Sequence, residues 1–198
     1  MKRLFTFALS VILLASCSNK ESKNAEDEAL KNIKVDAAIR LTTPLALADF
    51  KMMVPDIWVS EKPANEMRVV QYFLKHYSAV NVLGFNFGNK PEMVEANIQR
   101  WKDEYTKIDK FEESKFMNNT ISLSLITGTY KKKPTTMMSD EFKEAPGYMT
   151  LAAIVPSIQG PYFFKMVGPK IIVEKELPRF KAFLNSYTKF SPHGMMGM

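Results

Sequence analysis

A single cysteine, Cys17, stands at the end of an uncharged apolar run near the start of the chain. Its thiolate is the side chain best able to attack a lipid donor near neutral pH. The run extends from Leu4 to Ala15 and follows the basic pair Lys2 and Arg3. At about twelve residues it is shorter than the roughly 20 needed to cross a bilayer, and it has the length of the apolar region of a signal peptide.

The four residues Leu14, Ala15, Ser16 and Cys17 resemble the lipobox of bacterial lipoproteins. The resemblance implies that residues 1–16 are a lipoprotein signal peptide and that Cys17 becomes the acylated first residue, held by membrane lipid. Two or more acyl chains anchor a protein stably. Ser18, in place of the Asp associated with inner-membrane retention, favours the outer membrane of a bacterial cell envelope. A buried core cysteine and an ordinary cleaved signal are the alternatives.

The C-terminal end of the chain gathers soft metal ligands. One imidazole and three thioethers stand within six residues, namely His193, Met195, Met196 and Met198. Thioether sulfur together with imidazole favours Cu(I), and the intervening glycines would let a short tail fold around an ion. Residues 191–198 are therefore a candidate copper site, and a low-complexity terminus without metal is the alternative.

Arg100 and Trp101 are adjacent in the segment NIQRW. A guanidinium over an aromatic ring is a common recognition pair, so these two are candidate ligand-binding residues of a small-ligand carrier. The alternative packs Trp101 on a sheet and pairs Arg100 with a carboxylate such as Glu104. Lys165, within an aromatic segment, is either a lysine of lowered pKa in an apolar wall or one that meets solvent or an acid.

Catalytic signatures are missing from the sequence. It holds no GxSxG, HExxH or P-loop motif, and beyond Cys17 no cysteine accompanies the two histidines, His76 and His193. A hydrolase triad would need a nucleophile held beside its histidine, and His76 is expected in a hairpin turn. We therefore expect no enzyme activity and no cofactor.

Composition sets the domain organisation and the class of partner. Apolar residues make up 46% of the chain and the formal net charge is +6. An exported basic chain suits an anionic envelope surface rather than nucleic acid. The polar segment after Cys17 predicts that residues 17–38 are a flexible tether. A single domain over 39–190 and the tail 191–198 then complete the chain.

Hydrophobic periodicity predicts the elements of that domain. Segments rich in alternating, β-branched or aromatic residues predict strands at 48–54, 67–74, 80–87, 121–130, 147–155 and 161–167. Apolar residues at helical spacing predict helices at 92–107 and 172–187, with Pro178 in the first turn of the second. Consecutive strands joined by short turns imply antiparallel pairing. The predicted fold class is α+β, a single antiparallel sheet flanked by helices.

Several short motifs stand at characteristic spacing over about residues 48–188. They are VPxxW at 54–58, FxFG at 85–88, NIQRW at 97–101, GxY at 128–130 and GPYFFKxxGP at 160–169. This pattern resembles a family of uncharacterised bacterial lipoproteins and secreted proteins with a PsbP-like fold. The resemblance implies an antiparallel sheet between helices. It also favours a binding role, since PsbP-like proteins are mostly assembly or accessory factors.

Together these observations predict a membrane-anchored bacterial lipoprotein with a non-enzymatic binding or accessory domain. Its expected partners are membrane lipid, through acylated Cys17, and another protein of the cell envelope. Copper handling by the tail and small-ligand carriage by Arg100 and Trp101 are the alternative functions.

Overall fold

The structure is a computed structural model, and it describes residues 38–133 and 141–190. These belong to one compact unit, Lys34–Met198, whereas the unit Met1–Ile33 lies outside the described residues. The predicted signal peptide, the tail and all of the tether except Ala38 also lie outside them. The domain boundaries therefore remain predictions.

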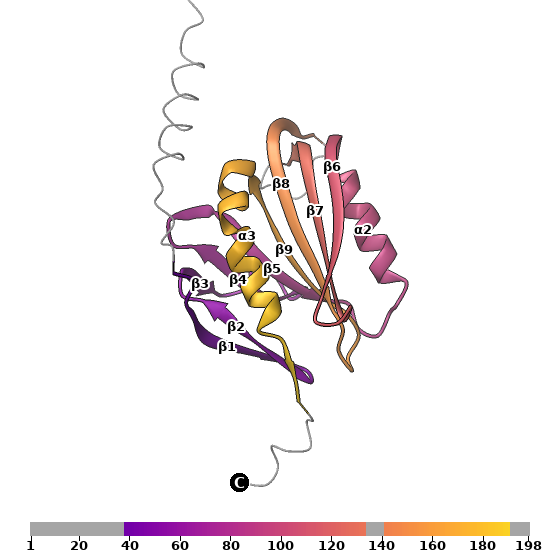
Figure 1. Cartoon of the computed structure of the whole chain (residues 1–198). Coiled ribbons are helices and arrows are strands. Elements are labelled where there is room, and N and C mark those ends of the chain that lie inside the picture. Colours follow the sequence, from indigo (N-terminus) through magenta and orange to yellow (C-terminus); the bar gives the residue numbers. More distant parts are fainter. Residues whose placement is uncertain (1–37, 134–140, 191–198) are drawn as a thin grey trace, which may run out of the picture. The chain divides into compact units, whose positions relative to one another are not determined.

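Strands dominate the described part of the chain (Figure 1). The strands are β1 (Leu41–Leu47), β2 (Phe50–Pro55), β3 (Trp58–Glu61), β4 (Arg68–Leu74), β5 (Tyr77–Asn86), β6 (Tyr105–Phe116), β7 (Ile121–Lys132), β8 (Lys143–Val155), β9 (Tyr162–Pro169) and β10 (Thr188–Lys189). The helices are α2 (Met93–Asp103) and α3 (Lys170–Asn185). Within the described ranges, no helix is long and apolar enough to span a bilayer.

Two antiparallel sheets are present. The large one has seven strands in the order β3-β4-β5-β9-β8-β7-β6, and the small one has three in the order β1-β2-β10. The prediction of an α+β fold with a single antiparallel sheet flanked by helices is therefore wrong, because the fold is mostly β with a second sheet. The second sheet was missed because β1 is half-exposed, without a clean alternation, and β10 is only two residues long.

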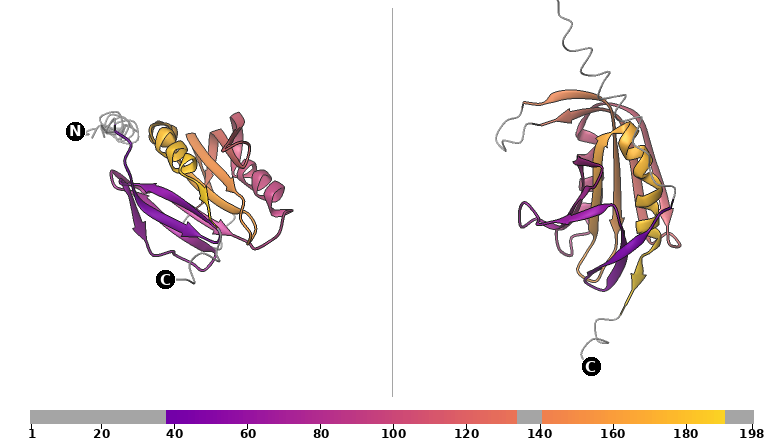
Figure 2. Two further views of the ribbon diagram at one scale, coloured as in Figure 1. Left: turned by 60° about the horizontal axis from the view of Figure 1, so that its bottom comes forward. Right: turned by 90° about the vertical axis from the view of Figure 1, so that its left-hand side faces the viewer.

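Strand β9 shows how the large sheet is covered on both sides. Successive side chains of a strand point to opposite faces. Phe163 packs edge-on against Trp101 of α2, whereas the next residue, Phe164, packs edge-on against Phe183 of α3. The two helices therefore lie on opposite faces of the sheet, as Figure 2 shows. We call these the α2 face and the α3 face.

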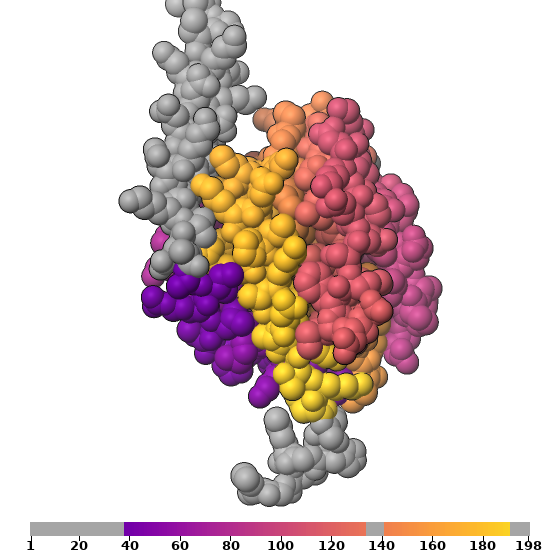
Figure 3. All heavy atoms as spheres, viewed as in Figure 1, coloured from indigo at the N-terminus to yellow at the C-terminus, as the bar shows by residue number. Residues whose placement is uncertain are grey.

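The α3 face is a filled aromatic core. Phe180 and Phe183 of α3 are fully buried, and both rings meet Trp58 of β3. Phe50 of β2 is also buried and contacts Tyr187, which joins the small sheet to the same core. Figure 3 shows α3 between the β1–β2 hairpin and the strands of the large sheet. Each such buried ring contributes about 1.5–3 kcal/mol of transfer free energy.

Helix α3 begins earlier than predicted. It starts at Lys170, so Pro178 lies well inside it rather than in its first turn. A proline there removes one backbone hydrogen bond of the helix. The carbonyl that loses this bond belongs to Glu174, which is exposed and can meet water instead.

Two tight loops meet at the end of the sheet from which α2 departs. Gly160, between β8 and β9, is buried and has φ +92°. A Cβ on Gly160 would stand 2.1 Å from the carbonyl oxygen of Gly88, in the β5–α2 loop. Only glycine permits both this conformation and this approach, so the contact fixes where the chain enters α2.

Candidate functional site

A pocket of about 350 Å³ opens on the α2 face of the large sheet. Alternate residues of β5 and β9 form its floor, and the end of α2 with β7 forms its wall. Its lining residues are Ala79, Asn81, Leu83, Phe85, Arg100, Glu104, Tyr130, Lys165 and Val167.

The pocket exists because α2 covers only part of its face. Trp101 of α2 is 1% exposed and lies over a buried cluster that includes Tyr105 and Phe163. Leu83 in β5 and Val167 in β9, by contrast, remain half-exposed, although both strands are internal to the sheet. A single helix of eleven residues is too narrow to cover seven strands, so part of the apolar floor faces solvent.

Lys165 and Glu104 form an ion pair inside the pocket. The Nζ of Lys165 donates to the Glu104 carboxylate, and the lysine side chain is only 12% exposed. Burial lowers the pKa of Lys165 below its usual value, because the charged ammonium loses hydration. Glu104 opposes that effect and Arg100 adds to it. Of the alternatives for Lys165, the structure combines an apolar wall with pairing to an acid.

Tyr130 of β7 lines the same wall. Burial raises the pKa of its phenol above the usual value, and the nearby Glu104 carboxylate raises it further. The Tyr130 ring stacks on Tyr148 with 5.5 Å between ring centroids and meets Tyr105 edge-on at 5.4 Å. Tyr130 is therefore held as a neutral phenol at a fixed position.

Arg100 and Trp101 are separated by the fold. The Arg100 guanidinium lies at the pocket wall, 5.8 Å from the Phe87 ring centroid, and donates to the side-chain oxygen of Asn97. Trp101 points into the core, as the packing alternative predicted. Glu104 pairs with Lys165 and not with Arg100, which leaves Arg100 without an ion pair among residues 38–133 and 141–190.

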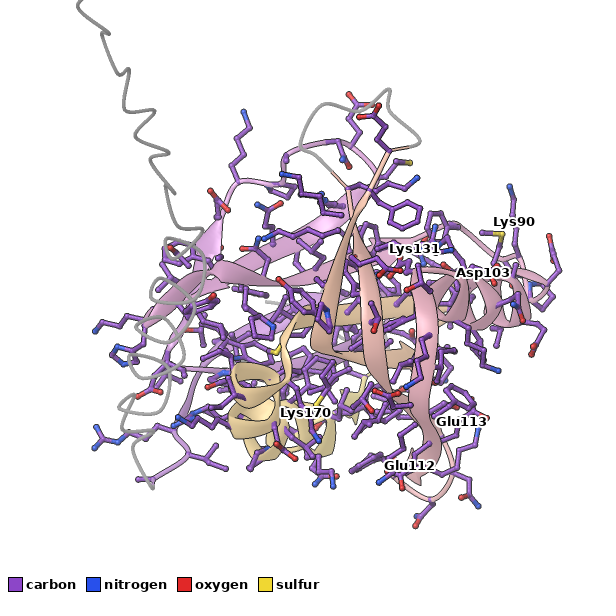
Figure 4. The ribbon with its side chains drawn as sticks, turned by 90° about the horizontal axis from the view of Figure 1, so that it is seen from above. Lys90, Asp103, Glu112, Glu113, Lys131 and Lys170 are labelled. Carbon is purple, nitrogen blue, oxygen red and sulfur yellow. The ribbon has the colours of Figure 1, made fainter. Side chains whose placement is uncertain are left out.

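Basic residues extend the site beyond α2. A second pocket of about 670 Å³ shares Arg100, Glu104 and Tyr130 with the first, and its remaining lining residues are Asp103, Lys131, Lys132, Lys133 and Phe142. The Nζ of Lys131 donates to the backbone oxygen of Asp103 at 2.8 Å and lies 5.7 Å from the Phe142 ring centroid. Figure 4 shows Lys131 beside Asp103 at one end of α2 and Lys90 at the other.

The other predicted sites fall elsewhere. His76 is exposed in the β4–β5 turn, where it was expected. Cys17 and the tail residues His193, Met195, Met196 and Met198 lie outside the described residues, so lipidation and copper binding stay predictions. Within the described ranges, no three His, Cys, Asp or Glu side chains gather as a metal site.

Sequence reasoning missed Tyr130 as a pocket residue and the pairing of Lys165 with Glu104. The two partners are 61 residues apart, and nothing local in the sequence marks their contact. A strand order that places β9 at the centre of the sheet would have been needed to find it.

No protein-family model and no curated protein matches the chain. The solved structures that are similar to it include the following two, each at 8% sequence identity. The Ran-binding protein Mog1p of Saccharomyces cerevisiae has a TM-score of 0.47, with 79% of this chain and 98% of that chain covered. Cyanobacterial PsbP of Synechocystis sp. PCC 6803 has a TM-score of 0.45, with 80% and 99% covered. Likeness at this level says nothing about what this chain binds.

Proposed function

We propose that this chain is a lipid-anchored, non-enzymatic binding or accessory domain of the bacterial cell envelope, and that the pocket on the α2 face is its binding site. The observation that carries the proposal is the contrast between the two faces of one sheet. The α3 face is filled by buried aromatic rings, whereas the α2 face leaves apolar floor and fixed charges open to solvent.

The arrangement of the pocket suits recognition. Binding sites are concave and mostly apolar, with a few polar groups held in place. Here Leu83, Phe85 and Val167 supply the apolar surface. The Lys165–Glu104 pair and the hydrogen-bonded Arg100 supply oriented charges. Rigid strands and a helix end hold these groups, which limits the ordering cost of binding.

Small-ligand carriage is the second candidate. The volume of about 350 Å³ falls in the range of roughly 300–1,000 Å³ typical of small-molecule sites. A protein partner would instead insert one side chain or a chain end into the same pocket.

Anchoring is tested with the full chain produced in a Gram-negative bacterium, as wild type and as Cys17→Ala. We expect the wild type to incorporate labelled palmitate, to gain the mass of its acyl chains and to sediment with the outer membrane. The Cys17→Ala chain should incorporate no label. Equal labelling of the two chains, or none in either, would remove the anchor from the proposal.

The binding role is tested by cross-linking the full chain in intact envelopes. Arg100→Gln changes the pocket wall, and the matched control Lys170→Gln removes an exposed cation from the α3 face. We expect an envelope component to be recovered with wild type and with Lys170→Gln, but much less with Arg100→Gln. Equal recovery with all three chains would place binding away from the pocket.

A further inference from the structure

We propose that the pocket binds a small amphiphilic anion, with a short aliphatic chain on the apolar floor and a carboxylate or phosphate head at Arg100 and the lysines of β7. This rests on the proposed function, because it names the ligand class of the same site.

The floor of the pocket fits an aliphatic chain. Leu83 and Phe85 are successive residues on one face of β5 and form a short apolar strip, and Val167 of β9 lies diagonally across from Leu83, whose direct partner is Lys165. Burying apolar area is worth about 25 cal/mol per Å². Asn81 lies between Leu83 and Ala79 on the same face of β5, so the apolar strip ends at Leu83. A chain without polar atoms can therefore cover this strip without leaving a hydrogen-bonding group of its own unsatisfied.

The charged residues of the lining determine whether the head of the ligand is an anion or a cation. Lys165 and Glu104 neutralise each other. Over this pocket and the adjoining pocket of about 670 Å³ together, the remaining lining holds Arg100 and the three lysines 131–133 against one carboxylate, Asp103, a net charge of +3. Uncompensated cations beside an apolar wall attract anions and disfavour cations.

Arg100 is positioned to bind the head of the ligand. A guanidinium binds a carboxylate or phosphate through paired N–H donors. One of its donors already holds Asn97, which orients the group. The head of a ligand anion therefore lies at Arg100 and Lys131, and its chain lies on the strip formed by Leu83 and Phe85.

The volume limits the size of the ligand. At about 30 Å³ for each non-hydrogen atom, the value for liquid water, the pocket of about 350 Å³ holds roughly ten such atoms. Octanoate has that size, and it is the probe we choose. Butanoate tests the head with too short a chain, octanol tests the chain without charge, and octylammonium reverses the charge.

The test is calorimetric titration of octanoate into the acylated full chain in phosphatidylcholine nanodiscs, with empty nanodiscs subtracted. We expect saturable 1:1 binding that weakens as salt increases. Octanol, butanoate and octylammonium should each bind at least about tenfold more weakly, because each lacks the chain or the correct charge. Octylammonium binding as tightly as octanoate would overturn the proposal.

Variants locate the binding. Arg100→Gln should weaken octanoate binding about tenfold, as expected for the loss of one charge-assisted contact. Glu104→Gln should tighten it, because the change removes one negative charge from the lining of the pocket. The controls Lys90→Gln, at the far end of α2, and Lys170→Gln should change it less than twofold. Weakening by the controls equal to that by Arg100→Gln would mean a diffuse charge effect and no site.

A second set of titrations distinguishes an anion that belongs to a bilayer lipid from one that is a free amphiphile. Nanodiscs containing phosphatidylglycerol offer a bilayer headgroup of the same chemistry. Reduced octanoate binding there would identify the membrane as the source, and unchanged binding would identify a free amphiphile. Loss of envelope cross-linking in Arg100→Gln without any octanoate binding would overturn the ligand class and leave the proposed function intact.

Discussion

The Nζ of Lys165 in β9 donates to the carboxylate of Glu104, the residue that follows α2, so one ion pair joins the centre of the large sheet to the end of its shorter helix. Both side chains are largely withdrawn from solvent. Among residues 38–133 and 141–190, neither partner forms a second ion pair.

Removing one member of this pair should destabilise the domain. We expect Lys165→Met to cost about 1–3 kcal/mol, because it leaves the Glu104 carboxylate half-buried and unpaired. The double variant with Glu104→Gln should recover part of that loss. Urea unfolding of the single and double variants measures the coupling. The exposed pair Lys107–Asp109 is the control, and Lys107→Met should produce no measurable change.

Glu176 should make stability depend on pH. Burial raises the pKa of Glu176 above its usual value, against hydrogen bonds from Trp58 and Arg179 and the nearby charge of His76. A folded pKa above the unfolded one stabilises the fold below the unfolded pKa, and this contribution is lost as pH rises through the folded pKa. The stability of wild type relative to Glu176→Gln should therefore fall as pH rises from 4 to 7.

Glu174→Gln, on the exposed side of the same helix, is the control for loss of a carboxylate. Thermal unfolding at several pH values measures both differences. A difference between wild type and Glu176→Gln that rises with pH would contradict the assigned direction.

Gly160→Ala should destabilise the domain more than Gly147→Ala. Both glycines have positive φ, +92° and +73°, so a side chain costs each about 1–2 kcal/mol in conformation. Only at Gly160 would the new Cβ meet backbone atoms, whereas nothing lies within 4 Å at Gly147. Equal urea midpoints for the two variants would show that the β8–β9 loop and the β5–α2 loop can move apart at little cost in free energy.

Trp101 should matter for stability and Arg100 for binding. Trp101→Phe leaves space in the cluster around Phe163, at an expected cost of about 1–3 kcal/mol. Its octanoate affinity, measured where the variant is fully folded, should match that of wild type. Arg100→Gln should leave the stability unchanged and weaken octanoate binding. Loss of octanoate binding in folded Trp101→Phe would support the prediction from sequence that Arg100 and Trp101 bind a ligand together.

The strands in which apolar, β-branched or aromatic residues follow a regular pattern could be predicted from sequence, because that pattern matches the buried faces of the strands in the structure. Strands β2, β4, β5, β7, β8 and β9 overlap the predicted segments. Strand β6 was missed and its start assigned to the helix. Tyr105 continues the helical spacing of Trp101 because both enter the same core, although they belong to different elements. Most of the rest of β6 is polar or charged and exposed, so no regular apolar alternation marked it.

The candidate site could be predicted only in part. Arg100 and Lys165 stood out by residue type, since a cation beside aromatic residues is unusual in either segment. Their meeting depends on the strand order, in which β9 lies between β5 and β8. Whether Trp101, the aromatic residue of the NIQRW segment, packs into the core depends on the position where α2 ends. Both the strand order and this position are determined by long-range packing, which leaves no local signal in the sequence.

The alternation of β9 has a consequence for how this chain can change over time. Phe163, Lys165 and Val167 face one side, and Tyr162, Phe164 and Met166 face the other. Inserting one residue into β9 would exchange the two sets, driving an ammonium into the aromatic core and a phenyl ring into the pocket. Substitutions over evolution can therefore alter the side chains of the pocket one at a time, but a change of one residue in the length of β9 would lose the pocket and the core together.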